Sequence, residues 1–285
     1  MTDSHTKPDL AETAKPKILN GLKSIDTFKT WGDWGEERHL LHELDLTTLP
    51  KHIAIIMDGN RRWARERNMH MLEGHRAGVR KAREVAELTL DINNTAGFKA
   101  IEALTFYAFS KENWNRSLFE VAGLMEIFEH AALREMLPLH ERNMQVKIIG
   151  DLDDLPESLR GKIREIEELT DENDGLTVNF CLSYSGRSDI LNGIKRIFKQ
   201  YKEGKLDADS INEDMFAKYL DTGKLPDPDL LIRTSGEMRF SNFLLWQIAY
   251  TELWVTPVFW PDFDYRNYVD AISEYQRRDR RYGGG

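Results

Sequence analysis

The sequence predicts a single α/β domain in which a mainly parallel sheet of six strands is flanked by helices. From residue 52 onward, short apolar runs alternate with longer segments of helical period, which is typical of strands joined by helical crossovers. Polar and charged residues follow three of these runs directly, as at the ligand-binding edge of a parallel sheet. A hydrophobic content of 41% over 285 residues is enough for one sizeable core.

The chain begins with a segment that does not share this pattern. Residues 1–45 are polar and irregular, so we expect a partly flexible extension that becomes a short packed helix near residues 31–44, where leucines recur. The catalytic domain is predicted to occupy residues 46–285. No composition shift or internal repeat indicates a boundary within it.

The apolar runs and one amphipathic segment give the elements of this domain. Strands are predicted at residues 52–57, 102–109, 145–150, 176–183, 229–233 and 252–256. Between the second and third strands, apolar residues fall at helical spacing from Val121 to Phe128, which predicts a helix over residues 118–137. Pro138 is expected to end that helix, because proline has no amide proton for the next turn.

The exit of the first strand predicts a phosphate site. Asp58 and Gly59 follow the apolar run, and Asn60, Arg61 and Arg62 begin the next element. Backbone amides at a helix start attract anions, arginines add forked donors, and an aspartate can hold a divalent cation against the same phosphates. The alternative is that Asp58 caps the helix while the arginines are solvated surface charges.

Two further strand exits favour the ligand-binding interpretation. The run before Ser110 leads into polar residues up to Arg116, and the run before Arg233 leads into a second polar segment that ends at Ser241. Ligands of open α/β sheets bind beyond the carboxyl ends of the strands. We therefore expect the three exits to face one crevice.

Charge and segment lengths limit the partners and the location. The net charge of −9 argues against nucleic acid as a partner, because phosphate-backbone binding normally needs a basic surface. The first residues lack a secretory signal, which favours a cytoplasmic protein. Apolar runs are too short to span a bilayer, so any membrane contact should be peripheral.

The three exits together resemble the signatures of the cis-prenyltransferase family over residues 52–283. The matching segments are 57–60, 107–116 and 233–252. The resemblance implies that isopentenyl diphosphate is added to an allylic diphosphate, usually farnesyl diphosphate, to make a Z-configured long-chain polyprenyl diphosphate. A short-chain Z-prenyl synthase and a non-catalytic lipid-diphosphate-binding partner subunit are the alternatives.

The same resemblance implies roles for individual residues. The allylic diphosphate would be surrounded by Gly59, Asn60, Arg61, Arg62, His75 and Arg116, and isopentenyl diphosphate would be held by Arg233, Arg239 and Ser241. Mg²⁺ would be bound by Asp58 and Glu252, with Asp58 also catalytic. Asn113 would accept or relay the proton, with Ser110 beside it. Further substrate contacts are expected from Trp63, Met71, Lys111, Glu112, Trp114 and Phe240.

Three other expectations come from the resemblance. Helices near residues 77–92 and over 118–137 would form the walls of a hydrophobic tunnel for the growing chain. Arg281 and Gly283 resemble a C-terminal motif that reaches the diphosphate site of the partner in dimeric members, which implies a homodimer. Met71 departs from the pattern, because many long-chain members have an arginine there.

Overall fold

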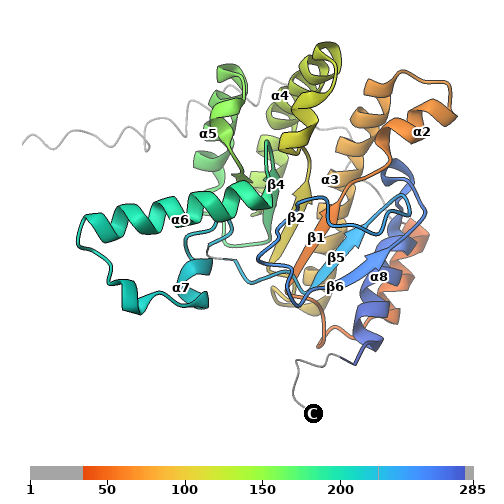
Figure 1. Ribbon diagram of the computed structural model, residues 1–285. Coiled ribbons are helices and arrows are strands. Elements are labelled where there is room, and N and C mark those ends of the chain that lie inside the picture. Colours follow the sequence, from red (N-terminus) through yellow and green to blue (C-terminus); the bar gives the residue numbers. More distant parts are fainter. Residues whose placement is uncertain (1–34, 224, 280–285) are drawn as a thin grey trace, which may run out of the picture.

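The computed structural model describes residues 35–223 and 225–279, and within them it confirms one α/β fold built on a six-stranded sheet (Figure 1). The strands are β1 (His52–Ile56), β2 (Ala103–Tyr107), β3 (Gln145–Ile149), β4 (Thr177–Cys181), β5 (Leu230–Arg233) and β6 (Glu252–Val255). All neighbours pair in parallel, in the order β3-β4-β2-β1-β5-β6. All six predicted strands are present, each somewhat shorter than its apolar run.

The central strands are apolar throughout because both faces of the sheet are covered. In β1, Ile53 and Ile55 point into the larger core cluster, whereas Ala54 and Ile56 point into the cluster on the other face. Each of the four is at most 5% exposed. This burial fixes the register of β1 against β2 and β5, since a slip by one residue would exchange the two faces.

Seven α-helices surround this sheet in the described residues. They are α2 (Asn60–Glu66), α3 (Met71–Ala96), α4 (Leu118–Glu141), α5 (Glu157–Thr170), α6 (Gly186–Lys202), α7 (Glu213–Ala217) and α8 (Tyr265–Arg277). Helix α3 packs against α2, α4 and α8, and α4 packs against α5. Helices α6 and α7 extend away from the body of the sheet (Figure 1). No helix of the described residues combines the length and the apolar character that a bilayer span requires.

Two predicted boundaries differ from the structure. Helix α4 continues through Pro138 to Glu141, so the expectation that Pro138 ends it is wrong. Leu137 and Leu139 are buried on either side of the proline, and their packing compensates for the missing amide bond. Helix α3 extends well beyond the predicted 77–92 at both ends.

The described part of the predicted extension is packed rather than separate. Gly35–Glu43 form a 3₁₀-helix, and residues 1–34 lie outside the described residues. Leu40, Leu41 and Leu44 belong to the main core cluster, and this segment lies against α8. A short packed helix near this position is therefore confirmed for its described residues.

Candidate active site

The topology creates a crevice beyond the carboxyl ends of β1 and β5. The chain leaves β1 toward β2 on one side of the sheet order, and it leaves β5 toward β6 on the other side. At such a switch point the loops diverge, and a ligand can lie between them. Asp58 follows β1 and Arg233 ends β5, directly beside Ile56.

Asp58 lies between two guanidinium groups. Arg233 donates to its Oδ2 at 2.9 Å, and Arg62 donates to its Oδ1 at 3.1 Å. Arg62 also donates to Glu237 at 3.3 Å, so it joins the first and third strand exits. The Arg233 side chain is 3% exposed and Asp58 is 28% exposed. The crevice therefore contains a buried cation whose carboxylate partner is open to solvent.

Close packing brings α2 and α3 against this crevice. Gly59 has φ 106°, and a Cβ there would come within 2.8 Å of the Phe259 ring and 3.0 Å of Ser235 Oγ. Gly74 of α3 faces the backbone oxygen of Asn60, which a Cβ would approach to 2.0 Å. Both positions need glycine for the helices to enclose the crevice.

A polar pocket with about 1470 Å³ of empty space opens between these elements. Its lining includes the predicted residues Asp58, Gly59, Asn60, Arg61, Arg62, Met71, His75 and Arg116. It also includes Met57, Arg65, Asn68, Met69 and His70, to which no site role had been assigned. The two groups together form a strongly cationic wall of a kind that suits a diphosphate.

Glu120 lies against two arginines and a histidine of this pocket and was not predicted. Its side chain is 3% exposed, and Arg116 donates to its Oε1 at 2.9 Å. His75 Nε2 lies 3.6 Å and Arg61 Nε 3.7 Å from the same oxygen. Arg116 precedes α4 with an extended backbone and Glu120 lies in its first turn, so no helical spacing signalled this contact in the sequence.

His75 is neutral in this setting. Burial, followed by the nearby positive charge of Arg116, lowers the pKa of His75 from 6.5 to about 4, against the opposing effect of Glu120. At pH 7 the ring can therefore donate one hydrogen bond without adding a fixed charge. A bound anion would favour the protonated ring.

The second exit is ordered by hydrogen bonds within the protein. Asn113 Oδ1 accepts from the Ser110 amide at 3.2 Å in a capping box. Glu112 accepts from Asn242 at 2.9 Å, and Trp114 donates to Ser183 at 2.9 Å. Lys111 pairs with Asp151. None of these five predicted residues lines the polar pocket, and Glu112 is the one that contacts the third exit, through Asn242.

The third exit forms a strained loop. Ser235, Ser241, Asn242 and Leu244 all have positive φ, between 44° and 78°. Such conformations are costly for residues with side chains and concentrate at functional sites. Ser241 Oγ accepts from Arg233 at 2.9 Å. Arg239 pairs with Glu237 and, like Phe240, is largely exposed at the mouth of the crevice.

Several buried polar atoms around the crevice have no described hydrogen-bond partner. They are Asn60 Oδ1, His75 Nε2, Arg233 Nε and Ser235 Oγ. Buried polar groups are normally satisfied, so atoms of this kind mark places where a ligand or water can bind. Their donors and acceptors point to a polar substrate group.

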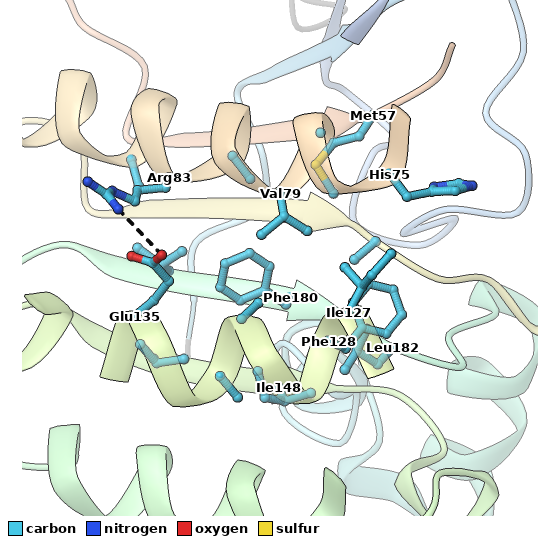
Figure 2. A pocket seen from close by; sticks show the side chains of 18 of the residues that line it. Met57, His75, Val79, Arg83, Ile127, Phe128, Glu135, Ile148, Phe180 and Leu182 are labelled. Carbon is cyan, nitrogen blue, oxygen red and sulfur yellow. Dashed lines mark hydrogen bonds and ion pairs between the residues drawn. The ribbon is translucent and has the colours of Figure 1, made fainter. Parts of the chain in front are cut away.

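An apolar tunnel continues from the polar pocket. It lies between α3, α4 and the sheet, has about 1080 Å³ of empty space when open solvent is included, and shares Met57, Asn60 and His75 with the polar pocket. Figure 2 shows Val79, Phe128 and other apolar side chains along it. The predicted tunnel between these helices is thus present, and Ala108 is among the residues that line it.

Some predicted site residues are not brought together. Glu252 begins β6 beside Leu230, at the amino edge of the sheet, where it pairs with Arg278 at 2.8 Å. Since Asp58 lies beyond the carboxyl edge, a single chain does not bring the two carboxylates together, and a Mg²⁺ site that they share stays a prediction. Trp63 donates to Asp262 at 2.6 Å and does not line the pocket.

The remaining predictions concern the metal and the C-terminus. Within the described ranges, no group of three His, Cys, Asp or Glu side chains has the arrangement of a metal site. Asp58 fits Mg²⁺ as a single ligand, because it lines the open pocket and Mg²⁺ often binds through one carboxylate, water and substrate phosphate. Arg281 and Gly283 lie outside the described residues.

Comparisons with known proteins agree with this geometry. A family model described as "Putative undecaprenyl diphosphate synthase" matches residues 56–283. An isoprenyl transferase of Heliobacterium mobile is 46% identical over 249 residues, which cover 87% of this chain and 93% of the relative. A ditrans,polycis-undecaprenyl-diphosphate synthase of Haemophilus influenzae, specific for (2E,6E)-farnesyl diphosphate, is 46% identical over 85% of this chain and 98% of its own.

A solved structure has the same fold. Lavandulyl diphosphate synthase from Lavandula x intermedia, crystallised with dimethylallyl diphosphate, superposes with a TM-score of 0.76 at 38% identity. The similarity covers 83% of this chain and 99% of the plant enzyme.

Proposed function

The chain belongs to the cis-prenyltransferase family of undecaprenyl diphosphate synthases, and we propose that it condenses isopentenyl diphosphate with farnesyl diphosphate to make a Z-configured long-chain polyprenyl diphosphate. The observation that carries this proposal is the direct connection between the cationic pocket and the apolar tunnel at Asn60 and His75. The two compartments match the charged head and the hydrocarbon tail of one amphiphilic substrate.

The allylic diphosphate would occupy the pocket lined by Arg61, Arg62, His75 and Arg116. As the allylic carbon–oxygen bond breaks, negative charge accumulates on the departing diphosphate. Fixed cations stabilise that charge more in the transition state than in the bound substrate. Glu120 keeps two of these arginines close together before the substrate arrives.

Isopentenyl diphosphate would bind at the third exit, where Arg233 and Ser241 are already hydrogen-bonded to each other. Arg239 at the mouth would add a second forked donor. The double bond of isopentenyl diphosphate then attacks the allylic carbon, and one proton must leave the new C5 unit. Asn113 is a poor base at neutral pH, so we assign it to orient a water or a phosphate oxygen that takes the proton.

Mg²⁺ held by Asp58 would neutralise part of the diphosphate charge when bound. For Asp58 to act as a ligand, at least one of its contacts with Arg62 and Arg233 must loosen. Arg62 is the more mobile candidate, because it is 33% exposed and has Glu237 as a second partner. Arg62 can then turn its guanidinium to the phosphates.

The tunnel supplies a driving force for repeated additions. Each buried CH₂ contributes about 0.8 kcal/mol, so a five-carbon unit contributes roughly 4 kcal/mol when it moves out of water. Apart from Arg83 and Glu135, the tunnel lining beyond Asn60 and His75 is apolar and suits this role. Elongation therefore proceeds into the tunnel while the diphosphate stays at the crevice.

Two exposed apolar surfaces suit contacts with a membrane and with a second copy of the chain. Met69, Leu118 and Phe119 are exposed beside the polar pocket, where the Phe119 ring meets His70 at 5.6 Å, and they support a peripheral membrane contact through which the product leaves. Leu191, Ile194, Phe198 and Tyr201 form an exposed apolar stripe on α6, which supports a homodimer. The C-terminal contact across that dimer and the cytoplasmic location stay predictions.

The proposed function is tested by incubating the protein with farnesyl diphosphate, excess isopentenyl diphosphate and Mg²⁺, and reading the product masses. We expect a long polyprenyl product, near eleven isoprene units, that disappears without Mg²⁺ and in Asp58→Ala. A product of only a few units would show a short-chain synthase instead. Absence of product from folded protein would contradict the transferase activity.

A further inference from the structure

An ion pair interrupts the apolar lining of the tunnel. Arg83 on α3 and Glu135 on α4 both line the cavity, with 3.5 Å between Arg83 Nη1 and Glu135 Oε1. Their side chains are 25% and 19% exposed, respectively. Figure 2 shows the pair at the end of the cavity opposite His75, where it bridges the two helices that form the walls.

The position of the pair relative to the crevice is set by α3. Arg83 lies about two helical turns further into the tunnel than His75. Among the described residues that line the tunnel, the other strongly polar side chains are Asn60 and His75, which belong to the diphosphate end. An apolar tail anchored at the crevice therefore meets no strongly polar side chain until it approaches this pair.

Within the pair, Glu135 is the member with a buried oxygen, Oε2, that has no described hydrogen-bond partner. Arg83 also donates from Nε to Glu87 at 3.1 Å, and burial raises the pKa of Glu87 to about 7 and also raises the pKa of Glu135. Further loss of water from these groups is unfavourable, because a buried charge needs compensating contacts.

We propose that Arg83 and Glu135 form a polar stop that closes the inner end of the tunnel and limits the length of the product. The proposal rests on the prenyl-elongation function argued above. A hydrocarbon unit that reaches the pair offers no hydrogen bond and displaces the remaining water. The gain from burying that unit is then offset by the desolvated charges, so elongation stops by charge rather than by a bulky side chain.

The first experiment compares product lengths. The variant Arg83→Leu/Glu87→Gln/Glu135→Leu removes the pair, and Glu87→Gln alone is its background control, since Glu87 would otherwise lose its buried partner. Lys81→Leu/Glu84→Leu removes an ion pair of α3 that does not line the tunnel. We expect the triple variant to lengthen the main product by at least one isoprene unit and both controls to keep the wild-type length.

Unchanged product length in an active triple variant would overturn the proposal. Should that variant fail to fold, Arg83→Met/Glu87→Gln/Glu135→Gln is the second variant, because it keeps side chains of similar length and removes all three charges together. It is expected to shift the distribution in the same direction, toward longer products. A wild-type distribution from this folded variant would also count against the stop.

A second experiment does not depend on turnover. Saturated alkyl diphosphates of increasing length are titrated into each protein and their affinities are measured. In the wild type, affinity should stop rising at the length that reaches the pair, whereas in the triple variant it should continue to rise. Identical dependence on length would refute the stop even if no condensation occurred, while normal binding without product would refute only the proposed function.

Discussion

Replacing Asp58 by asparagine should destabilise the free protein and change its response to diphosphate. The substitution keeps the shape of the side chain but removes the negative charge between Arg62 and Arg233. Removing one partner of a fully buried ion pair costs about 3–5 kcal/mol. Asp58 is partly exposed and Arg233 keeps Ser241 as an acceptor, so we reduce this to about 2 kcal/mol.

A loss of this size is measurable by thermal unfolding. At roughly 2–4 °C per kcal/mol for a domain of comparable size, the Tm of Asp58→Asn should fall by about 6 °C. Inorganic diphosphate should recover most of this loss, because its charge replaces the missing carboxylate beside Arg233. Without metal, diphosphate should bind the variant more tightly than the wild type, whereas added Mg²⁺ should strengthen binding only to the wild type.

Asp262→Asn is the matched control. Asp262 also accepts from an arginine, Arg67 at 2.9 Å, but it is 42% exposed and does not line the polar pocket. Its loss should change the Tm by no more than a surface ion pair does and should leave diphosphate binding unchanged. Equal Tm and equal metal-free diphosphate affinity for Asp58→Asn and the wild type would refute the assigned role of Asp58 as the counter-ion of Arg233.

Met71→Arg should lower the KM for farnesyl diphosphate about tenfold, the equivalent of one charge-assisted hydrogen bond at the pocket wall, and an unchanged KM would mean that another side chain already grips this substrate. The pKa of His75, measured by NMR, should be about 4 in the free protein and should rise when diphosphate binds, since the anion favours the protonated ring. The affinity for diphosphate should therefore increase as the pH falls from 7. A pKa near 6.5 in the free protein would contradict the argument that burial lowers it. Deleting residues 280–285 should raise the KM for isopentenyl diphosphate sharply, and unchanged kinetics would defeat the shared-site hypothesis. Phe198→Asp should shift the mass measured by light scattering from dimer to monomer, whereas a persistent dimer would place the interface elsewhere.

The sequence predicted the sheet because each of its strands is a short apolar run bounded by polar residues. It predicted much of the crevice for the same reason, since the carboxyl ends of parallel strands meet at one edge. It did not predict that Glu252 begins its strand at the other edge, because a strand pattern does not say which of its ends carries function. Pro138 was misjudged because local propensity yields to the packing of its neighbours.

The sequence alone does not show which helices that are distant along the chain contact each other. Glu120 was overlooked because its pocket is formed by Arg116, which precedes α4, and by His75 from α3, and a helical pattern shows neither contact. Likewise, Arg83 and Glu135 are ordinary helix-surface residues by pattern. Only the packing of α3 against α4 makes them the inner boundary of the tunnel.

Charged side chains lie at both ends of the cavity, and they favour the substrate at one end and oppose it at the other. At the crevice, Arg116 and Arg233 are held in place by Glu120 and Asp58 before a substrate arrives. A diphosphate brings more negative charge, so its interaction with these arginines is favourable. At the inner end, Arg83 and Glu135 meet hydrocarbon, which brings no charge and removes water. Because the diphosphate is fixed at the crevice, the distance from the crevice to the Arg83–Glu135 pair sets the length of the hydrocarbon chain that fits between them.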